Sequence, residues 1–267
     1  MQNSIFQAKH VSKSFLTEKL EPMTVLSEVN LTINDGEIIA FLGKSGAGKS
    51  TFLRIMAGLL PVSSGEVFCD GKLVDGPSHD MSMVFQTFAL MPWLTVYQNV
   101  SFGLEAKGLP KALIHEITDN MIELIGLDGY ENAYPKQLSG GMRQRVGFAR
   151  ALAVEPKILL LDEPFSALDI FTGQKLRHDL IKMWESKKIS TKSIVLVTHN
   201  VEEAVMIADR VVFFDSNPGR IGQEFKIAMP RSLRTKLNTL DQVEEISRLL
   251  TEQIAHAEAL AHAYDDE

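Results

Sequence analysis

The stretch Gly43-Lys44-Ser45-Gly46-Ala47-Gly48-Lys49-Ser50-Thr51 has the spacing G-x-x-x-x-G-K-S/T. The apolar run at residues 38–42 before it predicts a buried strand, and residues 52–57 after it suit a helix that ends at Gly58. Glycines let the loop wrap closely enough for its backbone N–H groups to point at phosphate oxygens, and the start of a helix adds a partial positive charge. This order of strand, loop and helix predicts a phosphate-binding loop rather than a Gly/Ser surface turn.

Side chains of the loop have separate expected roles. Lys49 would reach the β- and γ-phosphates of a nucleotide, and Ser50 would offer its hydroxyl to Mg²⁺. Lys44 and Thr51 are further expected phosphate contacts.

The composition predicts an ordinary folded chain of 267 residues, with 45% apolar and 23% charged residues. The net charge of -7 argues against broad binding to a nucleic-acid backbone. Cys69 is the only cysteine, so an intrachain disulfide or a cysteine-based zinc cluster is excluded. The N-terminus lacks the apolar core of a signal peptide, and no apolar run has the length of roughly 20 residues that a membrane span needs. We therefore expect a cytoplasmic protein whose membrane association comes through a partner.

Strands are predicted before and after the phosphate loop. Residues 5–15 and 25–33 precede it, residues 65–73 form a strand-turn-strand unit around Asp70-Gly71, and residues 81–85 form a short apolar strand. Phe15, at the end of the first strand, either stacks on an adenine ring or simply packs.

The chain from residue 88 to residue 104 is rich in large apolar side chains, among them Trp93 and Tyr97. These residues are either the core of a helical subdomain or, in part, a surface that binds another protein. An amphipathic helix at residues 110–124, ended by Gly126, follows. The pattern predicts a helical insertion between core strands.

A second anion site is predicted at Ser139-Gly140-Gly141, where a helix begins. The alternative is an ordinary N-cap serine followed by flexible glycines.

Polar residues end three predicted strands. Asp162 and Glu163 follow the apolar run 158–161, His199 follows the strand 193–198, and Gln86 follows the strand 81–85. Carboxylates at the carboxyl end of a parallel strand lie where open α/β sheets bind ligands. Asp162 can hold Mg²⁺ through water, and Glu163 can address the attacking water. His199 can bond a γ-phosphate, and its place at a strand end favours this role, although a lone histidine is usually structural. Gln86 can reach Mg²⁺ or the water, and the alternative is an ordinary glutamine at a strand end.

From residue 6 to residue 227 the chain resembles the nucleotide-binding subunits of ATP-binding cassette (ABC) transporters. The resemblance implies Walker A at Gly43–Thr51, the Q-loop at Gln86, the signature at Leu138–Gln144, Walker B at Asp162 and Glu163, and the switch histidine at His199. It also implies a D-loop at residues 166–169, in which Asp169 contributes to nucleotide binding.

The implied fold is α/β: a P-loop NTPase with an antiparallel β subdomain and a helical signature subdomain. We expect the nucleotide-binding domain at residues 5–229, with its helical subdomain at about residues 88–155. A helical extension would occupy residues 230–267, where apolar residues from Val243 to Ile254 form a stripe.

In this family each ATP lies between the Walker A of one subunit and the signature of the other, which implies a two-fold homodimer with ATP and Mg²⁺ bound. Residues 91–100, 139–145 and 217–221 resemble the nitrate/sulfonate/taurine importer group, although Ser166 and Asn200 depart from its pattern. The resemblance implies an ATPase on the cytoplasmic face of the inner membrane, partnered by a permease and indirectly by a solute-binding protein, with no nucleic acid. The alternative is a soluble ABC ATPase for complex assembly, such as iron-sulfur cluster delivery.

Overall fold

The computed structural model describes residues 3–87 and 89–265. It divides into two compact units, Met1–Ser78 with Ser193–Glu267, and His79–Lys192. The first contains the phosphate loop and is called the nucleotide-loop unit, and the second contains residues 138–144 and is called the signature unit.

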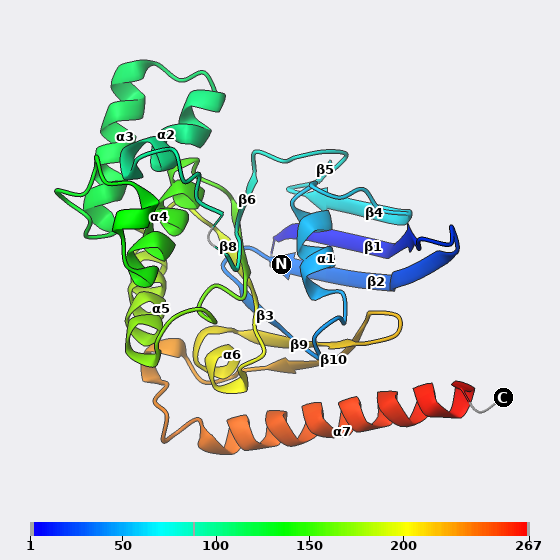
Figure 1. Cartoon of the computed structure of the whole chain (residues 1–267). Coiled ribbons are helices and arrows are strands. Elements are labelled where there is room, and N and C mark those ends of the chain that lie inside the picture. Colours follow the sequence, from blue (N-terminus) through cyan, green and yellow to red (C-terminus); the bar gives the residue numbers. More distant parts are fainter. Residues whose placement is uncertain (1–2, 88, 266–267) are drawn as a thin grey trace. The chain divides into compact units, whose positions relative to one another are not determined.

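An antiparallel sheet in the nucleotide-loop unit has the strand order β2-β1-β4-β5 (Figure 1). The strands are β1 (Ser4–Leu16), β2 (Pro22–Asn34), β4 (Ser64–Cys69) and β5 (Lys72–Leu73). Asp70 and Gly71 both have positive φ angles, of 48° and 74°, as the tight hairpin turn between β4 and β5 requires. The predicted antiparallel subdomain and its hairpin are therefore confirmed.

The same unit contains a second set of strands in the order β10-β9-β3-β8. The strands β3 (Ile38–Leu42), β8 (Ser193–Val197) and β9 (Arg210–Asp215) run parallel, and β10 (Arg220–Lys226) is antiparallel to β9. Every residue of β3 and β8 is buried, which explains why both strands are continuous apolar runs in the sequence. The aromatic rings of Phe41, Phe52 and Phe214 pack together here with centroids 4.9–5.9 Å apart.

Helices of this unit are α1 (Lys49–Met56), α6 (Val201–Ile207) and α7 (Leu240–Asp265), with a 3-10 turn at Arg231–Leu233. Helix α1 begins at Lys49, inside the glycine loop, rather than at Phe52. The reason is that Gly48, at φ 85°, turns the chain directly into the helix.

The signature unit combines the parallel strands β6 (Met81–Val84) and β7 (Ile158–Asp162) with four α-helices in the described residues. They are α2 (Val96–Ala106), α3 (Lys111–Leu124), α4 (Gly140–Ala153) and α5 (Ile170–Glu185), with a 3-10 turn at Pro135–Gln137. Helices α2, α3 and α4 share a core in which Val100, Ile122 and Val146 are almost fully buried. The predicted helical insertion is thus present, while residue 88, its predicted first residue, lies outside the described residues.

The C-terminal helix α7 packs on α6 and β9 of its own unit (Figure 1). Ile246 is its buried apolar anchor. The helix lies within residues 230–267, where the extension is predicted. Across the described part of the chain, every helix falls short of the length and apolarity that crossing a membrane would take.

Candidate functional site

The backbone of the phosphate loop surrounds the side chain of Lys49. Lys49 is 6% exposed, and its Nζ donates hydrogen bonds to the carbonyl oxygens of Gly43 at 2.7 Å and Lys44 at 2.8 Å. The loop residues Lys44, Ser45 and Gly46 are exposed, whereas Ala47 and Gly48 are buried. The exposed arc of the loop is therefore the part that a ligand can approach.

Close packing requires glycine at two positions of the loop. A Cβ atom on Gly43 would lie 2.5 Å from the carbonyl oxygen of Phe214, and one on Gly48 would lie 2.6 Å from Cδ2 of Leu26. Gly46 and Gly48 also have φ angles of 83° and 85°, in the left-handed region that other residues rarely adopt.

The N-terminus of α1 is suited to an anion. Among the described residues, no side chain caps this helix end and its first turn contains no acidic residue. Its backbone N–H groups and the helix dipole are thus directed at whatever occupies the loop. Ser50 and Thr51, both half-buried, lie in this first turn.

His199 lies at the same edge of the sheet as the phosphate loop. Strands β3 and β8 are parallel with Phe41 opposite Val197, and the backbone N–H of Thr198 donates to the carbonyl oxygen of Phe41 at 3.2 Å. The carboxyl ends of both strands, and the residues that follow them, therefore lie together. The His199 side chain is exposed, and its contact with a γ-phosphate stays a prediction.

Asn200, one of the two departures from the importer pattern, has a structural role. Its Oδ1 accepts a hydrogen bond from the backbone N–H of Glu203 at 3.0 Å and so caps α6. Asparagine and aspartate cap helices about equally well, so this departure leaves the position of His199 supported in the same way.

Gln86 and Glu163 meet in the signature unit, at the carboxyl ends of β6 and β7. These strands are parallel neighbours with Val84 opposite Leu161, and Nε2 of Gln86 donates to Oε2 of Glu163 at 3.0 Å. Asp162 is 7% exposed at the end of β7. Two predicted catalytic residues that are 77 positions apart are thereby in contact.

The backbone at Glu163 is unusual, with a φ angle of 45°. Ser166, the second departure, stabilises this turn because its Oγ donates to the carbonyl oxygen of Glu163 at 2.9 Å. A glycine would lack this hydrogen bond, so Ser166 supports the turn that carries the Glu163 carboxylate.

Ser139 is the N-cap of α4, since its Oγ accepts a hydrogen bond from the backbone N–H of Met142 at 3.2 Å. Ser139 is therefore an ordinary N-cap serine, as the alternative interpretation of Ser139-Gly140-Gly141 expects. Ser139 is nevertheless exposed, and a Cβ on Gly141 would lie 2.5 Å from Cγ2 of Thr172 on α5. This packing makes Gly141 a necessary glycine rather than a flexible one, and the exposed helix start remains available to an anion.

Asp169 caps α5, with Oδ1 accepting from the backbone N–H of Thr172 at 3.0 Å. Hydrogen bonds from the Thr172 side chain and then from its backbone lower the pKa of the Asp169 carboxyl. The structure thus gives Asp169 a helix-capping role, and its contribution to nucleotide binding stays a prediction.

Phe15 is 37% exposed on β1, with Nζ of Lys13 5.0 Å from its ring centroid. The ring is accessible to a base, and adenine stacking stays a prediction.

The predicted magnesium ligands supply one hydroxyl, one amide oxygen and one carboxylate, from Ser50, Gln86 and Asp162. These are the hard oxygen donors that Mg²⁺ prefers, and it commonly takes only one or two protein carboxylates together with substrate phosphates. Residues 3–87 and 89–265 contain no cluster of three or more His, Cys, Asp or Glu side chains that could hold a metal ion, and the assignment of the three Mg²⁺ ligands stays a prediction.

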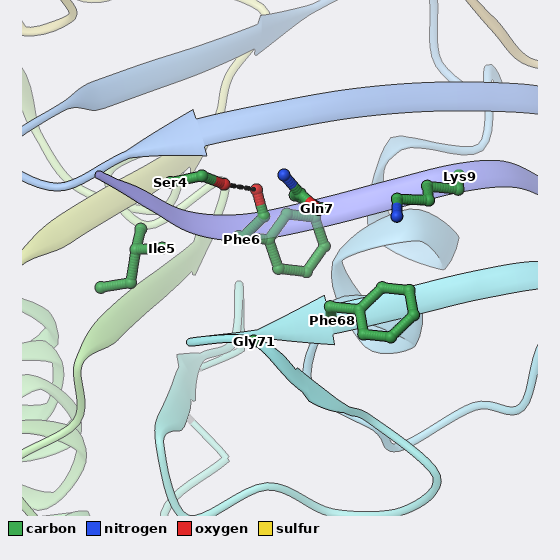
Figure 2. A pocket seen from close by; sticks show the side chains of 7 residues that line it. All are labelled: Ser4, Ile5, Phe6, Gln7, Lys9, Phe68 and Gly71. Carbon is green, nitrogen blue, oxygen red and sulfur yellow. Dashed lines mark hydrogen bonds between the residues drawn. The ribbon is translucent and has the colours of Figure 1, made fainter. Parts of the chain in front are cut away.

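Two cavities of the nucleotide-loop unit lie away from the predicted residues. One, of about 270 Å³, opens on the antiparallel sheet between Phe6, Lys9 and Phe68, where Nζ of Lys9 is 4.9 Å from the Phe68 ring centroid (Figure 2). The other, of about 560 Å³, is lined by Glu37, Arg210 and neighbours at the amino ends of β3 and β9. Neither is lined by a residue of the phosphate loop.

Sequence reasoning missed the residues that support the loop from behind. Gly219, in the turn between β9 and β10, donates its N–H to the carbonyl oxygen of Val25 at 2.8 Å, and a Cβ on it would collide with the carbonyl oxygen of Ala47. The Asn217-Pro218-Gly219 sequence was a signal for a tight turn, but nothing local showed what that turn touches.

Comparisons with known proteins place the chain in a family. Residues 26–166 match the family model of the ABC transporter. The chain is 46% identical over 230 residues, or 86% of its length and 85% of the relative's, to an uncharacterised ABC transporter ATP-binding protein of Methanocaldococcus jannaschii. It is 44% identical to the nitrate import ATP-binding protein NrtD of Synechocystis, with 81% of this chain and 80% of the relative covered. It is also 44% identical to the taurine import ATP-binding protein TauB of Escherichia coli, with 77% and 80% covered.

A solved structure is similar as well. The ATP-binding cassette MJ0796, in a dimeric post-hydrolysis state bound to ADP and Pi, superposes with a TM-score of 0.74 at 33% identity, covering 84% of this chain and 100% of that one.

Proposed function

The chain belongs to the ABC transporter family as one of its ATP-hydrolysing subunits, and on that premise we propose that it powers an importer for a small anionic or zwitterionic solute of the nitrate, sulfonate or taurine type. Its direct partners are a second copy of itself and a separate membrane permease. A solute-binding protein outside the cell would act indirectly, and no nucleic acid is required.

The relatives named for nitrate and taurine import support this substrate class, since two different importers of the group are each 44% identical to the chain over most of their length. The permease and the binding protein would select the solute. The ATPase would couple ATP hydrolysis to transport and would not determine which solute is transported.

The phosphate loop would bind ATP through the exposed arc of Lys44, Ser45 and Gly46 and through the first turn of α1. The Lys49 ammonium, which is held by two backbone carbonyl oxygens, would exchange part of this bonding for the β- and γ-phosphates. His199, at the same sheet edge, would bond the γ-phosphate.

The hydrogen bond between Gln86 and Glu163 is the observation that carries the catalytic proposal. Glu163 would accept a proton from the attacking water while the water oxygen bonds to the γ-phosphorus. The bond from that phosphorus to the bridging oxygen breaks, and ADP and phosphate leave. Gln86 would orient the carboxylate and, through it, the water.

Mg²⁺ would be held by oxygens of Ser50, Gln86 and Asp162 and would neutralise charge on the phosphates when bound.

The exposed start of α4 would complete the nucleotide site of a second copy. Ser139 and the N–H groups of Gly140 and Gly141 lie at the positive end of a helix of 14 residues, which favours the γ-phosphate of an ATP held by the partner. The dimeric state of the similar MJ0796 cassette supports this arrangement.

A permease contact would form on the signature unit around Trp93, which is 71% exposed. An exposed tryptophan on a folded domain is typical of a protein interface. Docking there would place the protein peripherally on the cytoplasmic face of the inner membrane. We expect Trp93→Ala to lower transport while the ATPase activity of the isolated protein is retained.

Affinity purification from detergent-solubilised membranes tests the transporter assignment. Recovery of a polytopic membrane protein that Trp93→Ala fails to recover would support it. Recovery of soluble scaffold proteins alone would favour the assembly function.

A further inference from the structure

The turn between β9 and β10 supports the phosphate loop from behind. Gly219 bonds to β2 on both sides, donating its N–H to Val25 and accepting from the backbone N–H of Ser27 at 2.9 Å. A side chain at Gly219 would collide with the carbonyl oxygen of Ala47 in the phosphate loop. This turn is therefore in backbone contact with the middle of the loop.

The end of β9 touches the beginning of the same loop. The carbonyl oxygen of Phe214 lies 2.5 Å from where a Cβ on Gly43 would be, and the Phe214 ring packs 5.9 Å from the ring of Phe52 in α1. A displacement of this strand end would move the phosphate loop, because no side chain separates the two backbones.

A polar contact joins helix α7 to this strand end. Nε2 of Gln253 donates a hydrogen bond to Oδ1 of Asp215. Asp215 follows Phe214 directly and is paired in the ladder with Arg220, which follows Gly219. A side chain at Gly222 would collide with the Gln253 amide, so the strand is open there to admit it. Phe214 and Gly219, which touch the phosphate loop, are thus adjacent in the chain to the Asp215–Arg220 pair, and Gln253 of α7 bonds to Asp215.

Helix α7 is weakly attached to the rest of its unit. Within residues 240–255, where its side chains are described, Ile246 is the fully buried apolar residue. Oε1 of Gln242 and Oε1 of Gln253 are buried without a hydrogen-bond partner, and such a burial costs free energy. These two unsatisfied amide oxygens weaken the docking of α7 on its unit.

We propose that Gln253 is a positioning residue for nucleotide binding: through Asp215 it keeps the β9–β10 turn against the phosphate loop, so that docking of α7 and binding of ATP favour each other. This inference rests on the proposed role of the loop at Gly43–Thr51. By linkage, ATP must then strengthen the docking of α7 as much as docked α7 strengthens ATP binding.

Charge substitutions at position 253 test the coupling in the full-length chain. Gln253→Glu places a like charge against Asp215, and we expect the Kd for a fluorescent ATP analogue to rise about five-fold, at the low end of typical coupling between sites. Gln253→Lys keeps a donor to Asp215, and its Kd should stay within about two-fold of the parent value on the same reasoning. Thr251→Glu adds the same charge on an exposed position of α7 and should leave the Kd unchanged.

Hydrogen exchange of α7 gives the reciprocal readout. ATP should slow exchange of the α7 amides in the parent and in Gln253→Lys, and should fail to slow it in Gln253→Glu. A merely structural role for Gln253 would change the melting temperature without this nucleotide dependence.

Lys49→Ala distinguishes the coupling through Gln253 from the assignment of the phosphate loop as the nucleotide site. If Lys49→Ala loses affinity and Gln253→Glu does not, the coupling is overturned and the phosphate loop stands. If Lys49→Ala binds like the parent, the loop assignment is wrong. Equal losses in Gln253→Glu and Gln253→Lys would also overturn the role of the Asp215 contact.

Discussion

Replacing Glu163 by glutamine removes one negative charge and little else. Glutamine has the same shape, its amide oxygen can still accept from Nε2 of Gln86, and the bonds from Ser166 go to the backbone carbonyl of residue 163. The left-handed backbone at this position, with φ 45°, suits both residues equally. We therefore expect an unchanged fold and melting temperature.

The expected loss of rate follows from comparing two effects. Weakening the exposed hydrogen bond with Gln86 costs about 1 kcal/mol, which corresponds to roughly five-fold in rate. Removing the base that accepts the proton of water costs roughly 10²- to 10⁴-fold. The second effect dominates, so loss of the base, rather than of the hydrogen bond, sets the expected loss of activity in Glu163→Gln.

The assay combines steady-state phosphate release with size-exclusion chromatography and light scattering. Because ATP binding survives and hydrolysis fails, Glu163→Gln should accumulate as an ATP-dependent dimer, separable from an ADP-bound monomer. Samples with and without Mg²⁺ distinguish nucleotide-driven association from turnover. Hydrolysis at the parent rate would refute Glu163 as the base, and a monomer at saturating ATP would refute the dimer as the catalytic unit.

Three further substitutions test other parts of the molecule. Lys49→Ala should weaken equilibrium ATP binding by roughly ten- to a hundred-fold, the value of a charge-assisted hydrogen bond, and an unchanged Kd in a nucleotide titration would contradict the loop assignment. Ser139→Arg should keep nucleotide binding by the monomer but lose turnover. Weak activity that is restored only when this variant is mixed with Lys49→Ala would show that the sites are shared between chains. Two independently active monomers would argue against shared sites. Gln144→Met should raise the free energy of unfolding by about 1–3 kcal/mol, because Gln144 is fully buried with both amide atoms unpartnered. Its melting temperature, read by differential scanning fluorimetry, should rise by about 2–4 °C per kcal/mol, and a fall would mean that the amide has a partner.

Local patterns predicted the elements that bear the site. The strand at residues 38–42, the glycine loop and the carboxylates after residues 158–161 all match the structure, because each depends on neighbouring residues alone. The sequence predicts a helix over residues 52–57, whereas α1 begins three residues earlier, at Lys49. Gly48 starts the helix earlier by turning the backbone.

In the apolar stretch after residue 88, composition alone did not distinguish core residues from surface residues. Trp93 is 71% exposed, whereas Val96, Val100 and Leu104 are buried. These three buried residues recur every fourth position of α2, which begins at a capping box formed by Thr95 and Gln98. Helical spacing was therefore a usable signal for the core, while the exposure of Trp93 depended on how the preceding turn packs.

The sequence by itself determined the phosphate loop, the order of strands and helices along the chain, and the identity of the polar residues at each strand end. The spacing of glycines and apolar residues acts over a few positions and needs no knowledge of distant segments. Only the tertiary structure decided that Gln86 contacts Glu163 and that Gln253 holds Asp215 behind the loop at Gly43. Those pairs lie 77 and 38 positions apart, and they meet because strand pairing and helix packing, which act over the whole chain, bring the segments together.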